Sequence, residues 1–436
     1  MASRRAERFQ PVERIEVWLW GEFVGACALD PTLGFYVFAY APDFRRLGIE
    51  PAPLQMQVAD DERTFVFPTL AVDTWRRLPA LLADALPDDF GNALIDRWLA
   101  ERGVGREQIT PLDRLAYMGR RAMGALEFRP QRGPLTRTPT AIELHELVGV
   151  ARTALRGTWD DDDAAAAALR AIIEVGTSAG GARAKAVVAW NPTTQELRSG
   201  QLDAPPGFEH WLLKFDGVGQ DRELGSSQDH GRIEFAYHRM AVAAGIAMTE
   251  CRLLQENGRA HFMTRRFDRD GPTTRHHVQT LCAMAHLDFR RRGANAWAQL
   301  FLTMRQLGLP REDLLQAFRR MAFGVMARNC DDHTKNTSFL LQRGAPWRLA
   351  PAYDVTFAHN PRGEWTSQHL MGVNGRFRDI TAADLLAEAD RFGLGEGKAI
   401  LAEVRAALAR WREFAHEAGV AAAEIERIGA LHRPLG

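Results

Sequence analysis

The first part of the chain shows an alternation of bulky and polar positions that predicts β-strands. Residues 14–20 (RIEVWLW) and 22–29 (EFVGACAL) alternate in this way around Gly21-Glu22, which is typical of a tight hairpin turn. Residues 33–44 (LGFYVFAYAPDF) predict a third strand. From Asp73 to Arg102 the apolar spacing becomes helical, with a second stripe of apolar residues starting after Asp88-Asp89. The sequence therefore predicts a β-rich start followed by helix.

A linker and a change of pattern divide the rest of the chain. The segment 130–141 (PQRGPLTRTPTA) has three prolines and few apolar residues, so we place a domain boundary there. Helical patterns follow at 141–156 and 160–173. The next elements predicted are strands at 182–190, 210–216 and 261–269, a helix at 232–246, and an almost wholly helical region from Val278, apart from 336–357. This order predicts an α+β, two-lobed molecule with domains at 1–130, 141–270 and 271–436.

Composition narrows the function classes. The 436 residues are 46% hydrophobic and 25% charged, which is ordinary for a folded globular protein. Basic and acidic residues both number 55, so no net positive field attracts nucleic acid or an anionic membrane. Neither a signal peptide nor a membrane-spanning run is apparent, and the cysteines Cys27, Cys251, Cys282 and Cys330 lack paired spacing. We expect a cytoplasmic protein without a disulfide framework.

Lysine is rare enough to be informative. The 55 basic residues include only four lysines, Lys185, Lys214, Lys335 and Lys398. A compact ammonium group can grip a phosphate end-on where a planar guanidinium does not fit, so each remaining lysine is a candidate for such a contact. Three of the four fall in the motifs described next.

Two motifs before residue 235 are suited to phosphate binding. Residues 175–185 (VGTSAGGARAK) form a glycine-rich segment whose backbone amides could approach phosphate oxygens, although it matches neither a Walker A motif nor the glycine-rich loop of protein kinases. Lys214 lies in the apolar strand HWLLKFD, where an ammonium group needs either solvent or an anion. Glu234 in the following helix is available to pair with it, as in kinases.

The most specific motif is residues 329–336 (NCDDHTKN). It contains Asp-x4-Asn, the spacing of the kinase catalytic loop, in which Asp is the base and Asn a Mg²⁺ ligand. Residues five apart diverge by about 140° on a helix, so Asp331 and Asn336 can converge only in a loop. Asp354 follows an apolar stretch, where the second metal ligand of a kinase would lie. A hydrolytic metal centre at Asp331, Asp332 and His333 is a weaker interpretation, because no second carboxylate or histidine cluster accompanies it.

With these motifs in order, the sequence resembles the HipA family, the kinase toxins of bacterial toxin–antitoxin modules. The resemblance runs through VWLWGEFVG, LPDDFGNALIDRWL and PLDRLAYMGRRAMGALEFRP in the amino-terminal part, and through SAGGARAK, HWLLKFD, RRFDR, NCDDHTKN and PAYDV in the kinase part. It implies a kinase-like fold, with a β-rich amino-terminal subdomain, a mixed N-lobe and an all-α C-lobe.

The resemblance also implies roles for single residues. Asp331 would be the catalytic base, Asn336 and Asp354 would bind Mg²⁺, and Ser178 would be an inhibitory autophosphorylation site. Residues expected to contact ATP are Gly180, Gly181, Ala182, Arg183, Ala184 and Lys185 over the nucleotide, Lys214 at the phosphates, Arg265, Arg266 and Phe267 at the hinge, and His333, Lys335, Asn336, Tyr353 and Asp354.

The resemblance further implies a Mg·ATP-dependent serine/threonine protein kinase. Family targets include aminoacyl-tRNA synthetases, so the expected consequences are impaired translation, growth arrest and persistence, neutralised by a helix-turn-helix antitoxin. Because the basic loop near residues 375–378 (GRFR) is short, we expect DNA contact only through that antitoxin. Two alternatives stay open: a small-molecule phosphotransferase with the same Asp-x4-Asn, and an inactive scaffold in an antitoxin–operator complex.

Overall fold

A computed structural model describes residues 9–59, 64–133, 141–142, 184–200, 203–216 and 229–435. Several predictions fall outside these ranges. They include residues 134–140 of the linker, the predicted helices at 143–156 and 160–173, and the glycine-rich segment as far as Arg183; the first two residues of the helix predicted at 141–156 form a strand instead.

The amino-terminal hairpin and third strand are confirmed. Strands β1 (Arg14–Leu19), β2 (Glu22–Asp30), β3 (Phe35–Tyr40) and β4 (Leu126–Arg129) form an antiparallel sheet in the order β3-β2-β1-β4. Ile15, Val17 and Leu19 are fully buried on one face, as their alternation predicts. The turn between β1 and β2 has positive φ angles at Trp20 and Gly21. At position 21, glycine adopts such an angle without strain.

The helical pattern at 73–102 is three helices, not one. A short helix α1 (Pro42–Arg45) precedes α2 (Val72–Trp75), α3 (Ala80–Ala83) and α4 (Asp89–Ala100), and 3-10 helix η1 (Arg106–Gln108) and α5 (Pro111–Met118) follow. Pro79 and Pro87 stand at the two breaks, where a missing backbone N–H cannot continue a helix. Asp88 then caps α4, accepting a hydrogen bond of 2.7 Å from the Gly91 amide. The corner at residues 84–88 thus joins α3 to α4.

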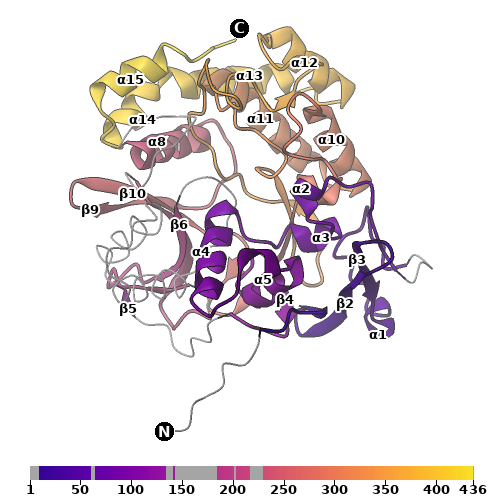
Figure 1. Cartoon of the computed structure of the whole chain (residues 1–436). Helices are drawn as coiled ribbons and strands as arrows, with labels where there is room; N and C mark the ends of the chain where they lie inside the picture. The colour runs from indigo at the N-terminus through magenta and orange to yellow at the C-terminus, as the bar shows by residue number, and fades with distance from the viewer. Residues whose placement is uncertain are drawn as a thin grey trace.

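A second sheet lies below α8 on the left of Figure 1. Its antiparallel strands run in the order β5 (Ala141–Ile142), β7 (Leu197–Ser199), β6 (Lys185–Trp190), β8 (Glu209–Lys214), β10 (Arg259–Arg265) and β9 (Cys251–Glu256). Every residue of β6 is buried, and so are the four central residues of β8. Helix α8 (His230–Ala243) packs beside β9 and β10. The strands predicted near 182–190, 210–216 and 261–269 are therefore confirmed in type.

The carboxy-terminal part is mainly helical and includes a long buried helix. Its helices are α9 (Leu281–Met284), α10 (Trp297–Gln306), α11 (Arg311–Ala327), α12 (Ala382–Arg391), α13 (Gly397–Ala409), α14 (Trp411–Glu417) and α15 (Ala422–Gly429). A hydrophobic core shared by α8 and these helices surrounds Phe301, Phe318 and Met321. Among the described residues, no helix combines the length and apolar character needed to cross a membrane.

Short strands accompany these helices: those at residues 338–341 and 348–349 lie in the segment 336–357 that the helical prediction from Val278 excepted, and those at 277–280, 295–296 and 371–372 were not predicted. They are β13 (His277–Thr280), β15 (Ser338–Leu341) and β16 (Arg348–Leu349) in one sheet, and β14 (Asn295–Ala296) beside β17 (Met371–Gly372) in another. A further pair, β11 (Arg269–Asp270) and β12 (Thr274–Arg275), follows β10. Strands of two residues leave no detectable period in a sequence.

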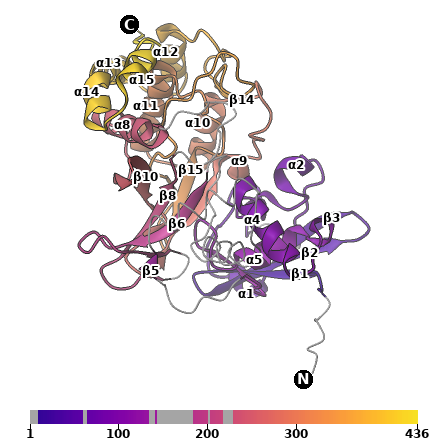
Figure 2. The ribbon, with the colours of Figure 1, turned by 60° about the vertical axis from the view of Figure 1, so that its left-hand side comes forward.

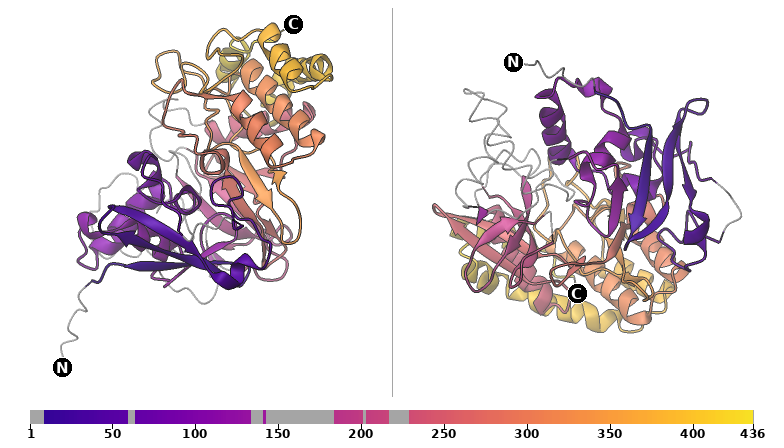
Figure 3. Two further views of the ribbon diagram at one scale, coloured as in Figure 1. Left: turned by 90° about the vertical axis from the view of Figure 1, so that its right-hand side faces the viewer. Right: turned by 90° about the horizontal axis from the view of Figure 1, so that it is seen from below.

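The amino-terminal part packs against the rest of the chain. Figure 2 shows the helical lobe at one end and the amino-terminal sheet at the other, with β6 and β8 between them. Both views of Figure 3 place the amino-terminal part against the rest of the chain. Hydrogen bonds across this boundary include Thr74 to Asp288 (2.6 Å), Thr280 to Asp84 (2.7 Å) and the Trp20 indole to the Arg275 carbonyl (2.7 Å).

Candidate active site

Lys214 stands at the centre of a buried ion-pair cluster. The last residue of β8, it places its Nζ 2.5 Å from Oε1 of Glu234 and also pairs with Oδ1 of Asp354. The side chains of Lys214 and Glu234 are only 12% and 3% exposed. The structure thus brings together a strand lysine, a helix glutamate and a downstream aspartate that the sequence predicted as one site.

Local structure explains why these three side chains meet. The apolar run of β8 is buried, which fixes the strand, and Glu234 lies on the buried face of α8. Asp354 follows the β15–β16 sheet in a turn with φ of 53°, a conformation that non-glycine residues seldom adopt. Such a conformation commonly marks a residue whose placement matters for function.

The charges in this cluster stabilise one another. Burial alone lowers the pKa of Lys214, but the carboxylates of Asp354 and Glu234 outweigh burial and hold this pKa above its ordinary value. Conversely, burial raises the pKa of Asp354, while Lys214 and Lys185 hold it below its ordinary value. Lys214 is therefore protonated and Asp354 ionised near neutral pH.

Lys185 lies directly beside Lys214. The two residues are cross-strand partners on β6 and β8, so their side chains emerge on the same face of the sheet. The Nζ atom of Lys185 lies 3.6 Å from Oδ2 of Asp88, and both of these side chains are buried. Asp88 belongs to the amino-terminal domain, and sequence reasoning did not select it. Ala184, just before Lys185, is buried and accepts a hydrogen bond of 3.0 Å from the Phe215 amide.

The segment 329–336 forms the loop that the Asp-x4-Asn spacing required. Helix α11 ends at Arg328 in a left-handed conformation, and the chain then leaves the helix. The side-chain nitrogen of Asn336 donates a hydrogen bond of 2.7 Å to the backbone carbonyl of Asp331, so the two ends of the motif meet. Asp331 is 46% exposed, and its Oδ1 lies 3.9 Å from Nε2 of His333. Its carboxylate is therefore accessible from solvent.

The neighbouring Asp332 has a different environment. It accepts hydrogen bonds from the Leu370 amide (2.7 Å) and from His369 Nδ1 (3.0 Å), and its side chain is only 8% exposed. Burial lowers the pKa of His369, but Asp332 outweighs burial and raises it to about 10. Asp332 and His369 are thus a buried ion pair that anchors the loop. His369 lies far along the sequence, and no motif indicated it.

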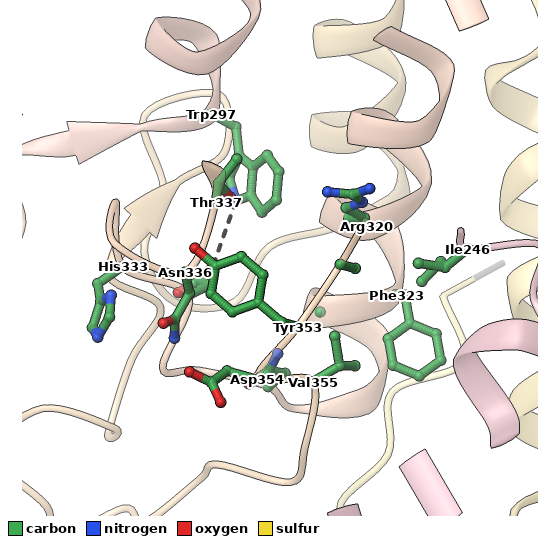
Figure 4. A pocket seen from close by; sticks show the side chains of 14 residues that line it. Ile246, Trp297, Arg320, Phe323, His333, Asn336, Thr337, Tyr353, Asp354 and Val355 are labelled. Carbon is green, nitrogen blue, oxygen red and sulfur yellow. Dashed lines mark hydrogen bonds between the residues drawn. The ribbon is translucent and has the colours of Figure 1, made fainter. Parts of the chain in front are cut away.

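A pocket joins the loop to Asp354 (Figure 4); this pocket, the adjoining Lys214 and Lys185, and the loop 329–336 are together called the cleft below. Its lining includes His333, Asn336, Tyr353 and Asp354, together with Trp297, Arg320 and Phe323 from the helical lobe. In the close-up, the Asn336 amide and the Asp354 carboxylate lie on the same side of the Tyr353 ring. The Tyr353 hydroxyl contacts Ser338 Oγ (2.6 Å) and donates to the Lys335 carbonyl (2.6 Å), which fixes the ring.

The donor set at this pocket fits Mg²⁺ bound together with a substrate phosphate. Within the described ranges, no group of three or more histidine, cysteine or acidic side chains forms a self-sufficient metal site. Mg²⁺, however, is usually held by one or two protein oxygens, substrate phosphates and water. Since the Asn336 amide nitrogen is used as a donor, its oxygen is the atom that can ligate, beside the ionised carboxylate of Asp354.

The residues expected at the hinge divide among different contacts. Arg266 is buried and makes a bidentate ion pair with Asp268 at 2.9 and 2.7 Å. Arg265 is 43% exposed and lies 3.7 Å from Glu209. Phe267 stacks on Tyr353 with ring centroids 5.7 Å apart. The structure therefore connects Phe267, rather than the two arginine side chains, to the pocket lining.

Two further expectations concern lysine and the glycine-rich turn. The Lys335 ammonium lies over the Phe289 ring, 4.8 Å from its centroid. Ser178, Gly180, Gly181, Ala182 and Arg183 lie outside the described residues. Their roles stay predictions.

Comparisons with known proteins identify the family. The model of the HipA-like C-terminal domain matches residues 177–422, more than half of the chain, and the model of the HipA N-terminal domain matches residues 15–129. The chain belongs to the HipA family. The family resemblance found in the sequence is thus confirmed, and the region matched by the C-terminal model contains the residues of the cleft.

A solved structure supports the same fold. The chain is similar to the HipA toxin from Shewanella oneidensis MR-1, solved with HipB and operator DNA, with a TM-score of 0.67 and 17% identity over 95% of this chain and 94% of that one. The two-lobed HipA-like fold is therefore confirmed. The Helicobacter pylori proinflammatory kinase CtkA aligns with a TM-score of 0.33 and 10% identity over 52% of this chain and 86% of that one. No curated protein matches the sequence.

Proposed function

We propose that this HipA-family chain is a Mg·ATP-dependent serine/threonine protein kinase that acts as the toxin of a toxin–antitoxin module. The reaction transfers the γ-phosphate of ATP to a protein hydroxyl. The observation that carries the proposal is the buried bridge of Lys214 between Glu234 and Asp354, next to a loop that joins Asp331 to Asn336. A lysine, a carboxylate base and two metal-ligand candidates, in this order along the chain, are the parts that phosphoryl transfer in kinases requires.

The roles follow from the environments of the side chains. Lys214 grips the nucleotide phosphates, and its charge is secured by two carboxylates. Asn336 and Asp354 would hold Mg²⁺, which would neutralise charge on the transferring phosphate. Residues Gly180–Lys185 cover the nucleotide, and Phe267 and Tyr353 offer aromatic surface beside it.

Asp331 is the better candidate for the base of the two adjacent aspartates. A base must reach the hydroxyl of a second substrate, and Asp331 is 46% exposed. Asp332 is committed to the Leu370 amide and His369. Asp331 therefore orients and deprotonates the attacking hydroxyl, and Asp332 holds the loop.

The partners in the proposal are a protein target and an antitoxin. The Shewanella oneidensis HipA was solved with HipB and operator DNA, which supports a helix-turn-helix antitoxin as partner of this chain and DNA contact through it. An aminoacyl-tRNA synthetase is the proposed class of target, and inhibited translation the proposed effect.

Two other functions use the same residues. A small-molecule phosphotransferase would share the cleft, and incubation with ATP and either cell protein or metabolites separates it from a protein kinase. An inactive scaffold is disfavoured, because a scaffold has no need of a buried lysine held between two carboxylates.

Autophosphorylation gives a further test. A phosphate on Ser178 would add up to about two negative charges near the proposed ATP phosphates, which would inhibit nucleotide binding. We predict that Ser178→Ala abolishes autophosphorylation, measured by intact mass after incubation with Mg·ATP. Equal phosphate incorporation in the variant would place the modified residue elsewhere.

A further inference from the structure

The amino-terminal domain reaches the proposed nucleotide site through the corner between α3 and α4. At this corner the two carboxylate oxygens of Asp88 make different contacts. Oδ1 accepts from the Gly91 amide at 2.7 Å and caps α4, and Oδ2 lies 3.6 Å from Nζ of Lys185. The side chains of Asp88 and Lys185 are 4% and 3% exposed. A contact between two domains is thus a buried ion pair at the cleft.

The position of Lys185 explains why a carboxylate is needed there. Lys185 and Lys214 are cross-strand partners, so two ammonium groups stand on one face of a buried sheet. Lys214 has Glu234 and Asp354 as counter-charges. Burial holds the pKa of Lys185 below its ordinary value; Asp88 and Asp354 act in the opposite direction and offset burial in part, and the charge of Lys214 adds to the lowering. Asp88 therefore supports the second cation in a place where burial and repulsion oppose it.

The same corner is connected by hydrogen bonds, through the start of α9, to the loop that contains Asp331 and Asn336. Asp84 accepts hydrogen bonds from the Thr280 amide (2.7 Å) and hydroxyl (2.8 Å) at the start of α9. The first amides of α9, those of Leu281 and Cys282, donate to the carbonyls of Thr337 (2.8 Å) and Thr334 (3.1 Å). The corner 84–88 thus contacts Lys185 on β6 directly through Asp88 and, through Thr280 and the start of α9, is connected to residues Thr334 and Thr337 of the loop segment.

We propose that Asp88 is a positioning residue of the nucleotide site, supplied by the amino-terminal domain, that holds the Lys185 ammonium beside Lys214 so that both cations face the nucleotide phosphates. The inference rests on the proposed function of the cleft. Its consequence is that the amino-terminal domain contributes to nucleotide affinity as well as to the fold.

Asp88→Asn tests this directly, because asparagine caps a helix as well as aspartate but carries no charge. The matched control is Asp96→Asn in the same helix, which breaks ion pairs with Arg106 and Arg114 inside the amino-terminal domain. Calorimetry with Mg·ATP on the full chain should show a Kd about tenfold higher for Asp88→Asn, as expected for one weakened charge-assisted phosphate contact, and within about twofold of wild type for Asp96→Asn.

The result can be separated from a purely structural effect. In a Lys185→Gln background, adding Asp88→Asn should change the Kd by less than about twofold, because the two side chains act as one unit. This double variant also removes both buried charges, so it gives a readout even if Asp88→Asn alone does not fold. A folded Asp88→Asn with wild-type or tighter affinity, or an equal loss in both backgrounds, would overturn the inference. Failure of wild type to bind Mg·ATP would instead reject the proposed function.

Discussion

The two walls of the cleft differ in how they hold their charged groups. On the strand wall, Lys185 and Lys214 are 3% and 12% exposed, and each faces a carboxylate from another element. On the loop wall, the Asp331 carboxylate is 46% exposed and lies 3.9 Å from a histidine. The strand wall is preorganised by buried ion pairs, and the loop wall presents an accessible carboxylate.

This difference matches two chemical tasks. Groups that bind a charged ligand gain from being fixed before it arrives, since no reorganisation is then needed. A base that meets a second macromolecular substrate must be reachable from outside. The loop must nevertheless be held in place. Asp332 does this by accepting hydrogen bonds from His369 and from the Leu370 amide.

The largest effect on catalysis is expected for Asp331, the exposed carboxylate of the loop wall. Asp331→Asn should lower kcat for phosphoryl transfer by roughly 10²–10⁴-fold, the usual contribution of a general base, with the KM for ATP nearly unchanged. Asp43→Asn, at a side chain 93% exposed, is the inert control. Steady-state kinetics on folded protein measures kcat and the KM for ATP in both variants. Near-normal kcat would remove Asp331 from the role of base and erase the proposed contrast between the walls.

On the preorganised wall, Lys214→Met should weaken Mg·ATP binding by roughly 10²-fold and lower the free energy of unfolding by about 3–5 kcal/mol, because Glu234 is left buried without this counter-charge. Lys398→Met, at an exposed position, is the matched control. Calorimetric binding and denaturant unfolding give the two quantities. Unchanged affinity and stability would show that the bridge is unimportant in solution.

The ion pair between Asp332 and His369 predicts that the free energy of unfolding depends on pH. The pKa of His369 is raised to about 10, from about 6.5 in an unfolded chain, so its stabilising effect is complete below about pH 6.5 and is lost as pH rises through 10. His369→Gln should therefore lower the free energy of unfolding by about 3 kcal/mol at pH 6, with a smaller difference from wild type at pH 10. Exposed His416→Gln is the control. A difference that does not vary with pH would contradict a charged His369.

Sequence reasoning succeeded where local pattern and short motifs carried the information. The amino-terminal hairpin follows from alternation over β1 and β2, and the family follows from several motifs in a fixed order. The pairing of Lys214 with Glu234 followed from the need of an ammonium group in an apolar strand for an anion, whereas Asp354 was predicted as a metal ligand and its ion pair with Lys214 was not. Each of these inferences depends on residue type and spacing alone.

The sequence did not indicate contacts made only by tertiary packing. Asp88 looks like an ordinary helix cap, and only the tertiary structure brings its second oxygen within 3.6 Å of the Lys185 ammonium. His369 pairs with Asp332 across 37 positions, and a single histidine carries no spacing signal. The sequence also did not indicate that Asp268 forms a bidentate ion pair with Arg266.

The most direct test of the account is transfer of radiolabelled γ-phosphate from ATP with Mg²⁺, comparing wild type with Asp354→Ala, first alone and then with lysate from cells lacking the cognate antitoxin. Intact mass must first show that the wild-type protein is not already phosphorylated. The account predicts label on protein with wild type and a loss of at least roughly 10²-fold in the variant, since Asp354 is a proposed metal ligand. Absence of label on any protein, with ATP binding demonstrated, would contradict a protein kinase.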